Sequence, residues 1–226
     1  MKITALIPAR SNSERFPGKN YVDFFGKPLF VHSTDFARCC PLIDEYYVTT
    51  NDKNVIAICN ERNIPYLERP DKYCTPTSNS SEYVNHFLKT QYLLKNKMPD
   101  ALLILQPTNP IREDLFVADM VDLYKQSRAD CVFTVVKCKS KMGRIVDGRF
   151  VPFNYKFEQR SQDLTDYYEE KGILYLIRVA SFLREGTLFG KINIPYVIPE
   201  KYRNLDIDTV LEKDIAELIL QKHIES

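Results

Sequence analysis

Short apolar runs of strand length alternate along most of the chain with segments of helical periodicity. The run that starts at Ile3 has the length and composition of a fully buried strand, and 101–105 is the most apolar run of all. Further strands are expected at 45–50, 64–67 and 131–137, and helices at 29–40, after Asp52, at 82–94 with Ser81 as cap, and at 113–126. This alternation predicts an α/β fold with a doubly wound, mostly parallel sheet.

The pattern changes after residue 140. Short alternating segments with many aromatic residues surround a hairpin signal at 146–149, and we expect a β-hairpin arm at about 140–170 inserted into a single domain of residues 1–226. An exposed aromatic hairpin needs covering, so we expect a homodimer that forms through it. Strands at 172–178 and 192–198 and a helix at 179–184 follow.

The last helix starts with a capping box, Thr209-x-x-Glu212. Its period is expected to turn an apolar face inward, made of Leu211, Ile215, Leu218 and Ile219.

Composition narrows the possible partners. The 226 residues carry 31 Lys and Arg against 30 Asp and Glu, so no global basic field favours nucleic acid or a membrane surface. No apolar run reaches the roughly 18 residues of a membrane span and no signal peptide precedes the first strand, so we expect a cytoplasmic protein. The six cysteines show no C-x-x-C pairing and are expected to be reduced and mostly buried, and the three histidines to be structural.

A cationic loop follows the first strand and carries Arg10, Arg15 and Lys19 among small residues such as Ser13. Ligands of open α/β sheets gather at the carboxyl ends of the strands, so these cations suit an anionic substrate such as a nucleoside triphosphate. The loop is neither a P-loop nor a G-x-G-x-x-G turn, and an ordinary solvated loop explains it equally well when it is considered alone.

Three more polar segments follow strands. Residues 69–81 form a long loop rich in proline and hydroxyl side chains, and 106–112 form a second loop. Asp206 and Asp208 flank Ile207, so in an extended segment both carboxylates project to one face, which suits Mg²⁺ bound with a triphosphate. Considered alone, D-x-D is better explained by capping of a helix N-terminus, but the four segments together hold the inventory for phosphoryl or nucleotidyl transfer.

The ordered motifs resemble those of the acylneuraminate cytidylyltransferase (CMP-sialic acid synthetase) family nearly throughout the chain. They are Ile7-Pro8-Ala9-Arg10-x-Asn12-Ser13, Pro17-Gly18-Lys19-Asn20, Phe25-Gly26-Lys27-Pro28-Leu29, Arg69-Pro70, Leu105-Gln106-Pro107-Thr108-Asn109-Pro110-Ile111-Arg112, Arg160-x-Gln162-Asp163-Leu164, Gly172-Ile173-Leu174-Tyr175 and Asp206-Ile207-Asp208-Thr209. The resemblance implies a Rossmann-like nucleotidyltransferase that moves CMP from CTP to the anomeric hydroxyl of a nonulosonic (sialic-type) 2-keto sugar acid, releases pyrophosphate and requires Mg²⁺.

The resemblance also implies roles for individual residues. Arg10, Lys19 and Asp208 are the expected catalytic residues, and Asp206 and Asp208 the metal ligands. CTP is expected to contact Arg10, Ser13, Arg15, Lys19, Asn20, Arg69 and either Ser80 or Ser81. The sugar acid is expected to contact Gln106, Thr108, Asn109, Arg160 and Tyr175, with Arg160 pairing its carboxylate.

The chain departs from the family pattern at several positions. Glu14 stands where the family usually has Lys, and Lys171-Gly172-Ile173 where it has Asn-Gly-Ala. The exact sugar therefore stays open, and a 3-deoxy-octulosonate cytidylyltransferase is an alternative, although the Gln106 segment argues against it. A nucleotide-sugar glycosyltransferase using Asp206-x-Asp208 and a catalytically inactive nucleotide-binding protein are further alternatives.

Overall fold

The structure is a computed structural model that describes residues 1–11, 13–96 and 98–224; Asn12 of the opening motif lies outside them. Seven strands form the central sheet, in the order β11 (Asn193–Ile198), β7 (Cys131–Cys138), β10 (Tyr167–Arg178), β6 (Ala101–Ile104), β1 (Ile3–Pro8), β4 (Glu45–Thr50) and β5 (Tyr66–Glu68). Only β10 runs antiparallel to its neighbours β6 and β7, so the prediction of a mostly parallel sheet is confirmed.

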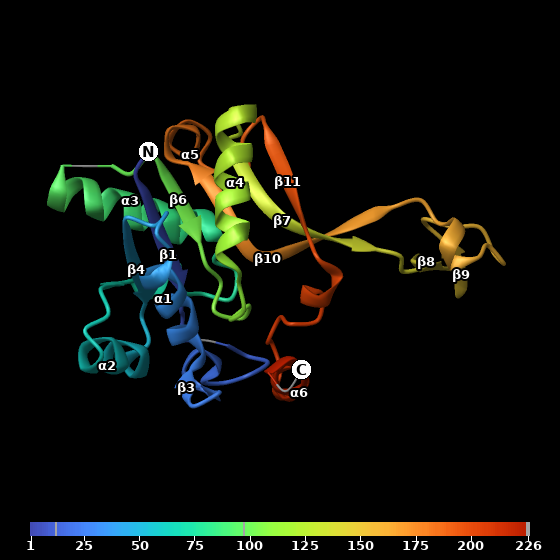
Figure 1. Cartoon of the computed structure of the whole chain (residues 1–226), viewed down its shortest axis with the longest axis horizontal. Coiled ribbons are helices and arrows are strands. Elements are labelled where there is room, and N and C mark those ends of the chain that lie inside the picture. Colours follow the sequence, from blue (N-terminus) through green and yellow to red (C-terminus); the bar gives the residue numbers. More distant parts are fainter. Residues whose placement is uncertain (12, 97, 225–226) are drawn as a thin grey trace.

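Helices cover both faces of this sheet (Figure 1). They are α1 (Leu29–Cys39), α2 (Lys53–Glu61), α3 (Ser80–Lys95), α4 (Asp114–Ser127), α5 (Val179–Glu185) and α6 (Val210–Ile224). Side chains of α1, α2, α4 and α6 join the core on one face, while α3 and α5 form a second core on the other face. The sheet is thus doubly wound, as the sequence predicts.

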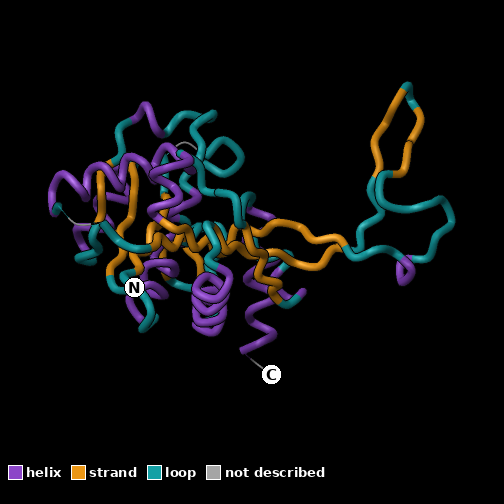
Figure 2. The backbone as a smooth tube through the Cα atoms, turned by 90° about the horizontal axis from the view of Figure 1, so that it is seen from above, coloured by secondary structure: helices purple, strands orange, loops and turns teal. Residues whose placement is uncertain are grey.

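An arm leaves the body where β7 and β10 extend beyond the sheet, and Figures 1 and 2 show it projecting away from the helices. Its tip is a two-stranded sheet of β8 (Gly143–Val146) and β9 (Arg149–Pro152). Asp147 and Gly148 join these strands with φ of 49° and 72°, a pair of left-handed residues that matches the right-handed twist of a hairpin. The expected hairpin is present, and the division of the chain into domains stays a prediction.

Smaller elements complete the chain. β2 (Asp23–Phe24) and β3 (Lys27–Pro28) pair with each other, and four 3-10 turns are η1 (Lys19–Tyr21), η2 (Asp71–Tyr73), η3 (Ser161–Asp163) and η4 (Glu200–Tyr202). Among the described residues, no helix combines the length and the apolar composition that crossing a membrane requires.

Two local predictions are wrong. The cap of α3 is Asn79, whose side-chain oxygen accepts from the Glu82 N–H at 3.2 Å, and Ser81 lies inside the helix. The apolar face expected to point inward on α6 is largely exposed: Leu211 is 67% and Leu218 is 59% exposed, whereas Ile219 packs against the core, and Ala216 is the buried residue among 210–221. The helical period therefore identified an apolar stripe, most of which the described residues of this chain do not cover.

Candidate active site

A cavity of about 490 Å³ opens at the carboxyl ends of β1 and β6, next to the loop after β5. Its lining joins segments that are far apart in sequence: Pro8, Arg10, Ser13, Glu14, Arg15, Lys19, Asn20, Arg69, Tyr73, Pro76, Ser78, Asn79, Ser80, Tyr83, Gln106, Pro107 and Thr108. The predicted cationic loop and two of the other predicted polar segments thus converge on one site, as expected for the open edge of a doubly wound sheet.

The loop after β1 is held in place by hydrogen bonds that side chains donate to its backbone carbonyls. The hydroxyl of Thr50 donates to the Ala9 carbonyl, and the buried Asn20 amide donates to the Arg10 carbonyl at 2.9 Å. Arg10 itself reaches the loop after β5, where its Nη1 donates to the Thr75 carbonyl at 2.5 Å. Asn20 therefore fixes the loop, while Arg10 presents its charge on the wall of the cavity.

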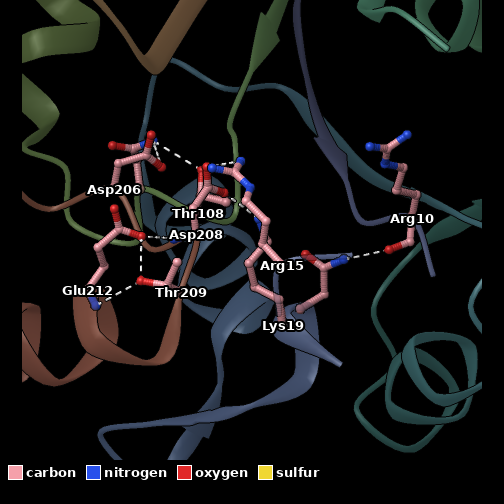
Figure 3. Close-up of polar contacts among 10 residues, drawn as sticks. Arg10, Arg15, Lys19, Thr108, Asp206, Asp208, Thr209 and Glu212 are labelled. Atoms are coloured by element: carbon pink, nitrogen blue, oxygen red, sulfur yellow. Dashed lines mark hydrogen bonds and ion pairs between the residues drawn. The ribbon is translucent and has the colours of Figure 1, made fainter. Parts of the chain in front are cut away.

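Asp208 is paired with two cations of the same loop (Figure 3). Lys19 Nζ lies 2.6 Å from Oδ1, and the Arg15 guanidinium donates to Oδ2. Burial raises the pKa of the Asp208 carboxyl, but the hydrogen bonds and charges of Lys19 and Arg15 outweigh burial, so its pKa lies below the usual value. The first and last polar segments of the chain meet here.

Asp206 has a different environment. Ile207 is fully buried and its N–H donates to the Thr108 carbonyl at 2.7 Å, which fixes the segment between the two aspartates. The side-chain amide of Asn109 donates to Asp206 Oδ1 at 3.1 Å. Burial, together with the charge of Asp208, raises the pKa of Asp206 although Thr108 and nearby lysines act in the opposite direction. The Asp206 carboxylate is thus short of positive charge.

This donor set fits a hard divalent cation. Asp206 and Asp208 are absent from the described lining of the cavity, but Asp208 pairs with Lys19 and Arg15, which line it. Carboxylate oxygens such as these suit Mg²⁺. No group of three or more His, Cys, Asp or Glu side chains that could hold a metal occurs in the described part of the chain. A metal here would therefore need further oxygen ligands from a substrate or from water.

The wall formed by the loop after β5 is built around Arg69. This side chain is only 3% exposed; its Nη2 donates to the Thr49 carbonyl at 2.7 Å, and its guanidinium stacks 4.8 Å from the ring centre of Tyr83. Of the two serines that the sequence left open, Ser80 lines the cavity and Ser81 is absent from its described lining.

Gln106 forms the opposite wall, and two residues determine where it lies. Gly172 packs against the Gln106 side chain, since a Cβ at this glycine would lie 2.5 Å from Gln106 Oε1. The buried guanidinium of Arg112 donates to the Gln106 carbonyl, to Ile173 O at 3.2 Å and to Ser33 Oγ at 3.0 Å. Arg112 therefore ties the loop after β6 to β10 and to α1.

Three predicted sugar ligands are not open to the cavity in the single chain. Asn109 is only 1% exposed, and its Oδ1 has no hydrogen-bond partner among the described residues. The phenol of Tyr175 is largely buried and donates to Glu170 Oε1 at 2.7 Å. Arg160 lies exposed on the arm and pairs with Asp163, with Nε 2.7 Å from Oδ2. Arg160 is absent from the described lining of the cavity.

Comparison with known proteins agrees with this geometry. The family model described as Cytidylyltransferase matches residues 4–216. The chain belongs to the cytidylyltransferase family.

Relatives within this cytidylyltransferase family act on different sugar acids. The chain is 27% identical over 228 residues to an N-acylneuraminate cytidylyltransferase of Escherichia coli O18:K1:H7 (strain RS218 / NMEC). The matched region covers 98% of this chain but only 52% of that relative. It is 26% identical over 238 residues to a pseudaminic acid cytidylyltransferase of Campylobacter jejuni subsp. jejuni serotype O:23/36 (strain 81-176), covering 100% of this chain and 99% of the relative. A solved CMP:2-keto-3-deoxy-manno-octonic acid synthetase complexed with CTP has the same fold, with a TM-score of 0.68 at 14% identity over 99% of this chain and 100% of that chain.

Two residues that shape the candidate active site of this cytidylyltransferase were not predicted from the sequence. Tyr83 lies one turn into α3, facing the cavity and Arg69, and its only signal was its spacing of three from Ser80. Arg112 was noted only as the end of a motif, and no sequence pattern reveals that its guanidinium collects two carbonyls and a hydroxyl from three elements.

Proposed function

We propose that the protein transfers a cytidylyl group from CTP to the anomeric hydroxyl of a nonulosonic 2-keto sugar acid and releases pyrophosphate. The observation that carries the proposal is the ion pairing of Lys19 and Arg15 with Asp208 at the rim of the cavity. It joins the expected phosphate-binding loop to the expected metal-binding segment in a chain of the cytidylyltransferase family. The named relatives that the chain matches over nearly its whole length act on sialic-type acids.

The nucleotide is proposed to lie between the loop after β1 and the loop after β5. Arg10, Arg15 and Lys19 would bind the triphosphate as fixed and mobile cations, helped by Ser13. Asn20 would act by holding the loop, because its amide is already engaged with Arg10 O. Arg69 and Ser80 would contact the nucleoside from the wall that the loop after β5 and the start of α3 form.

Asp206 and Asp208 are proposed to hold Mg²⁺, which would supply charge neutralisation at the phosphates. The chain's own contribution to the reaction is electrostatic and positional. Lys19 and Arg15, which meet at Asp208, would stabilise the negative charge that develops on the leaving pyrophosphate, and catalysis of phosphoryl transfer depends mainly on such placement. The metal, rather than a histidine, would assist proton loss from the attacking hydroxyl, since no histidine lines the cavity in the described residues.

The acceptor is proposed to lie over Gln106 and Thr108, which line the cavity next to Asp206. A glutamine amide can both donate to and accept from sugar hydroxyls or an N-acyl group. Asn109 would orient the Asp206 carboxylate through its hydrogen bond to Oδ1. Tyr175 would act indirectly, through the hydrogen bond that its phenol donates to Glu170. We assign Arg160 to the acceptor only as a residue brought from the arm of a second chain.

A homodimer is therefore part of the proposal. The arm exposes large apolar side chains, among them Ile145, Phe153 and Phe157, and α6 exposes a second stripe. Exposed apolar side chains gathered on one element are typical of protein interfaces, and a two-fold dimer would use the same surfaces on both copies. We further propose a cytoplasmic location, consistent with six unpaired cysteines.

The test is release of pyrophosphate from CTP with Mg²⁺ and a panel of keto-sugar acids. Turnover with sialic-type acids is expected, and Asp208→Ala should abolish it while leaving the thermal unfolding transition cooperative. Turnover with 3-deoxy-octulosonic acid alone would instead favour the octulosonate enzyme. CTP binding without turnover would indicate a nucleotide-binding protein, and sugar transfer from a nucleotide sugar a glycosyltransferase.

A further inference from the structure

Lys171 is a largely buried cation on β10 at the point where the strand leaves the sheet. The pairing of β10 with β7 is interrupted between Glu170 and Tyr175, and the buried hydroxyl of Thr134 closes the gap. Thr134 Oγ1 donates to the Lys171 carbonyl and accepts from the Leu174 N–H at 3.2 Å. The backbone that carries the lysine is therefore fixed, as in other β-bulges beside functional sites.

The Lys171 side chain is only 13% exposed, and among the described residues its ammonium group pairs with one carboxylate. Nζ lies 2.6 Å from Glu169 Oε1, whose side chain is 44% exposed. An ammonium group has three donors, and this contact uses one of them. A second anionic partner can therefore bind without removing the lysine from its position.

Lys171 also lies beside the proposed reaction centre. The next residue, Gly172, packs against the Gln106 side chain that lines the cavity. The charges of Lys171 and Lys19 both act on the Asp206 carboxylate, but Lys19 is already paired with Asp208.

The chemistry of the acceptor places its carboxylate close to this point. In a 2-keto sugar acid the carboxylate is bonded to the same carbon as the anomeric hydroxyl. If that hydroxyl attacks a phosphate held near Asp206 and Asp208, the carboxylate must lie near them too. Arg160, the partner expected from the resemblance, lies exposed on the arm and is paired with Asp163.

We propose that Lys171 binds the carboxylate of the acceptor and makes the site specific for acids over neutral ketoses. The proposal rests on the function proposed above. Glu169 holds the ammonium group until the acceptor arrives. Lys171 thus acts as a specificity element within the chain itself, independent of a second copy.

The test compares one sugar acid with its own carboxamide as acceptors, using kcat/KM from pyrophosphate release. We expect the wild-type protein to prefer the acid by about 10- to 100-fold, the range for a hydrogen bond between charged groups. Lys171→Gln should reduce this preference to less than about 3-fold through a higher KM for the acid, with the KM for CTP unchanged. Lys171→Arg, which keeps the charge, should retain most of the preference.

Two controls separate this role from a structural one. Glu169→Gln breaks the same ion pair but leaves the lysine, so it should preserve the preference for the acid. Lys137→Gln removes a lysine paired with Asp166 at the base of the same arm, and it should leave the preference unchanged. An unaltered acid-to-amide ratio in Lys171→Gln, or an equal loss in Glu169→Gln, would overturn the assignment of Lys171. Failure of the wild-type protein to use any keto-sugar acid would instead refute the proposed function.

Discussion

Gly172→Ala is expected to weaken acceptor use without disturbing CTP binding. A Cβ at this position would lie 2.5 Å from Oε1, 2.8 Å from Cδ and 3.0 Å from Nε2 of Gln106. Ordinary carbon contacts are about 3.5–4.0 Å, so the amide must move by about 1 Å. The φ of Gly172 is not positive, so alanine can adopt its backbone conformation, and the flexible end of Gln106 can move without a shift of the strand.

The magnitude follows from the sensitivity of positioned groups. A displacement of about 1 Å in an acceptor ligand can cost up to about 100-fold in kcat/KM. We expect a loss of about 10- to 100-fold in kcat/KM for the sugar acid, an unchanged KM for CTP, and a change in unfolding free energy below about 1 kcal/mol. The assay is steady-state pyrophosphate release with each substrate varied in turn, together with thermal unfolding.

A double variant tests the mechanism of this loss. If Gly172 acts through Gln106, the combination with Gln106→Ala should be no worse than Gln106→Ala alone. Additive losses would mean that the methyl group acts elsewhere. Wild-type kinetics in Gly172→Ala would remove Gln106 from the acceptor site.

The remaining predictions concern charge, support and assembly. The folded-state pKa of Asp206 is raised, so its ionisation costs stability as pH rises; Asp206→Asn should raise the metal-free Tm at pH 7, with the gain fading below about pH 4. The folded-state pKa of Asp208 is lowered, so its ion pairs stabilise the fold above about pH 4 and are lost as pH falls. Asp208→Asn should therefore lower the Tm at pH 7 and have little effect on the Tm in acid. Tm shifts of the same sign for Asp206→Asn and Asp208→Asn would contradict the ion pairing of Asp208. Arg112→Met should lower the free energy of unfolding, measured by chemical denaturation, by about 3 kcal/mol because it leaves buried carbonyls unpaired. A decrease below about 1 kcal/mol would show that water replaces the guanidinium. Phe153→Asp should convert a dimer to a monomer in light scattering without lowering the Tm of the body, and an unchanged mass would exclude the arm from the interface.

Much of the fold follows from local patterns. The limits of β4 and the start of β7 coincide with those predicted, and α1 starts one residue after Pro28, which the sequence placed at its first helical position. The antiparallel direction of β10 was not predicted, because a buried apolar run has no direction in its sequence. The exposed stripe of α6 shows the same limit, since periodicity identifies an apolar face but not what covers it.

Residues of the candidate site could be predicted where several sequence motifs supported one another. They could not be predicted where their role depends on tertiary contacts between distant elements. Arg15, Lys19 and Asp208 were all named from the sequence, yet their pairing across 189 residues or more depends on the sheet. Arg112 contributes through three tertiary contacts of its guanidinium and has no local signature. Lys171 stood out only as a departure from a family pattern, and its burial gives that departure a physical meaning.

The pairing of Asp208 has a consequence for the order of binding. Lys19 and Arg15 are proposed to bind the triphosphate, but in the ligand-free chain both are engaged with Asp208. A triphosphate that takes these cations leaves the partly buried Asp208 without its partners, which is costly unless another cation replaces them. Binding of CTP and of a divalent cation at Asp208 should therefore favour each other, since each removes the cost of the other. The same ion pairs that link the two ends of the chain in its ligand-free state thus couple nucleotide and metal in the proposed reaction.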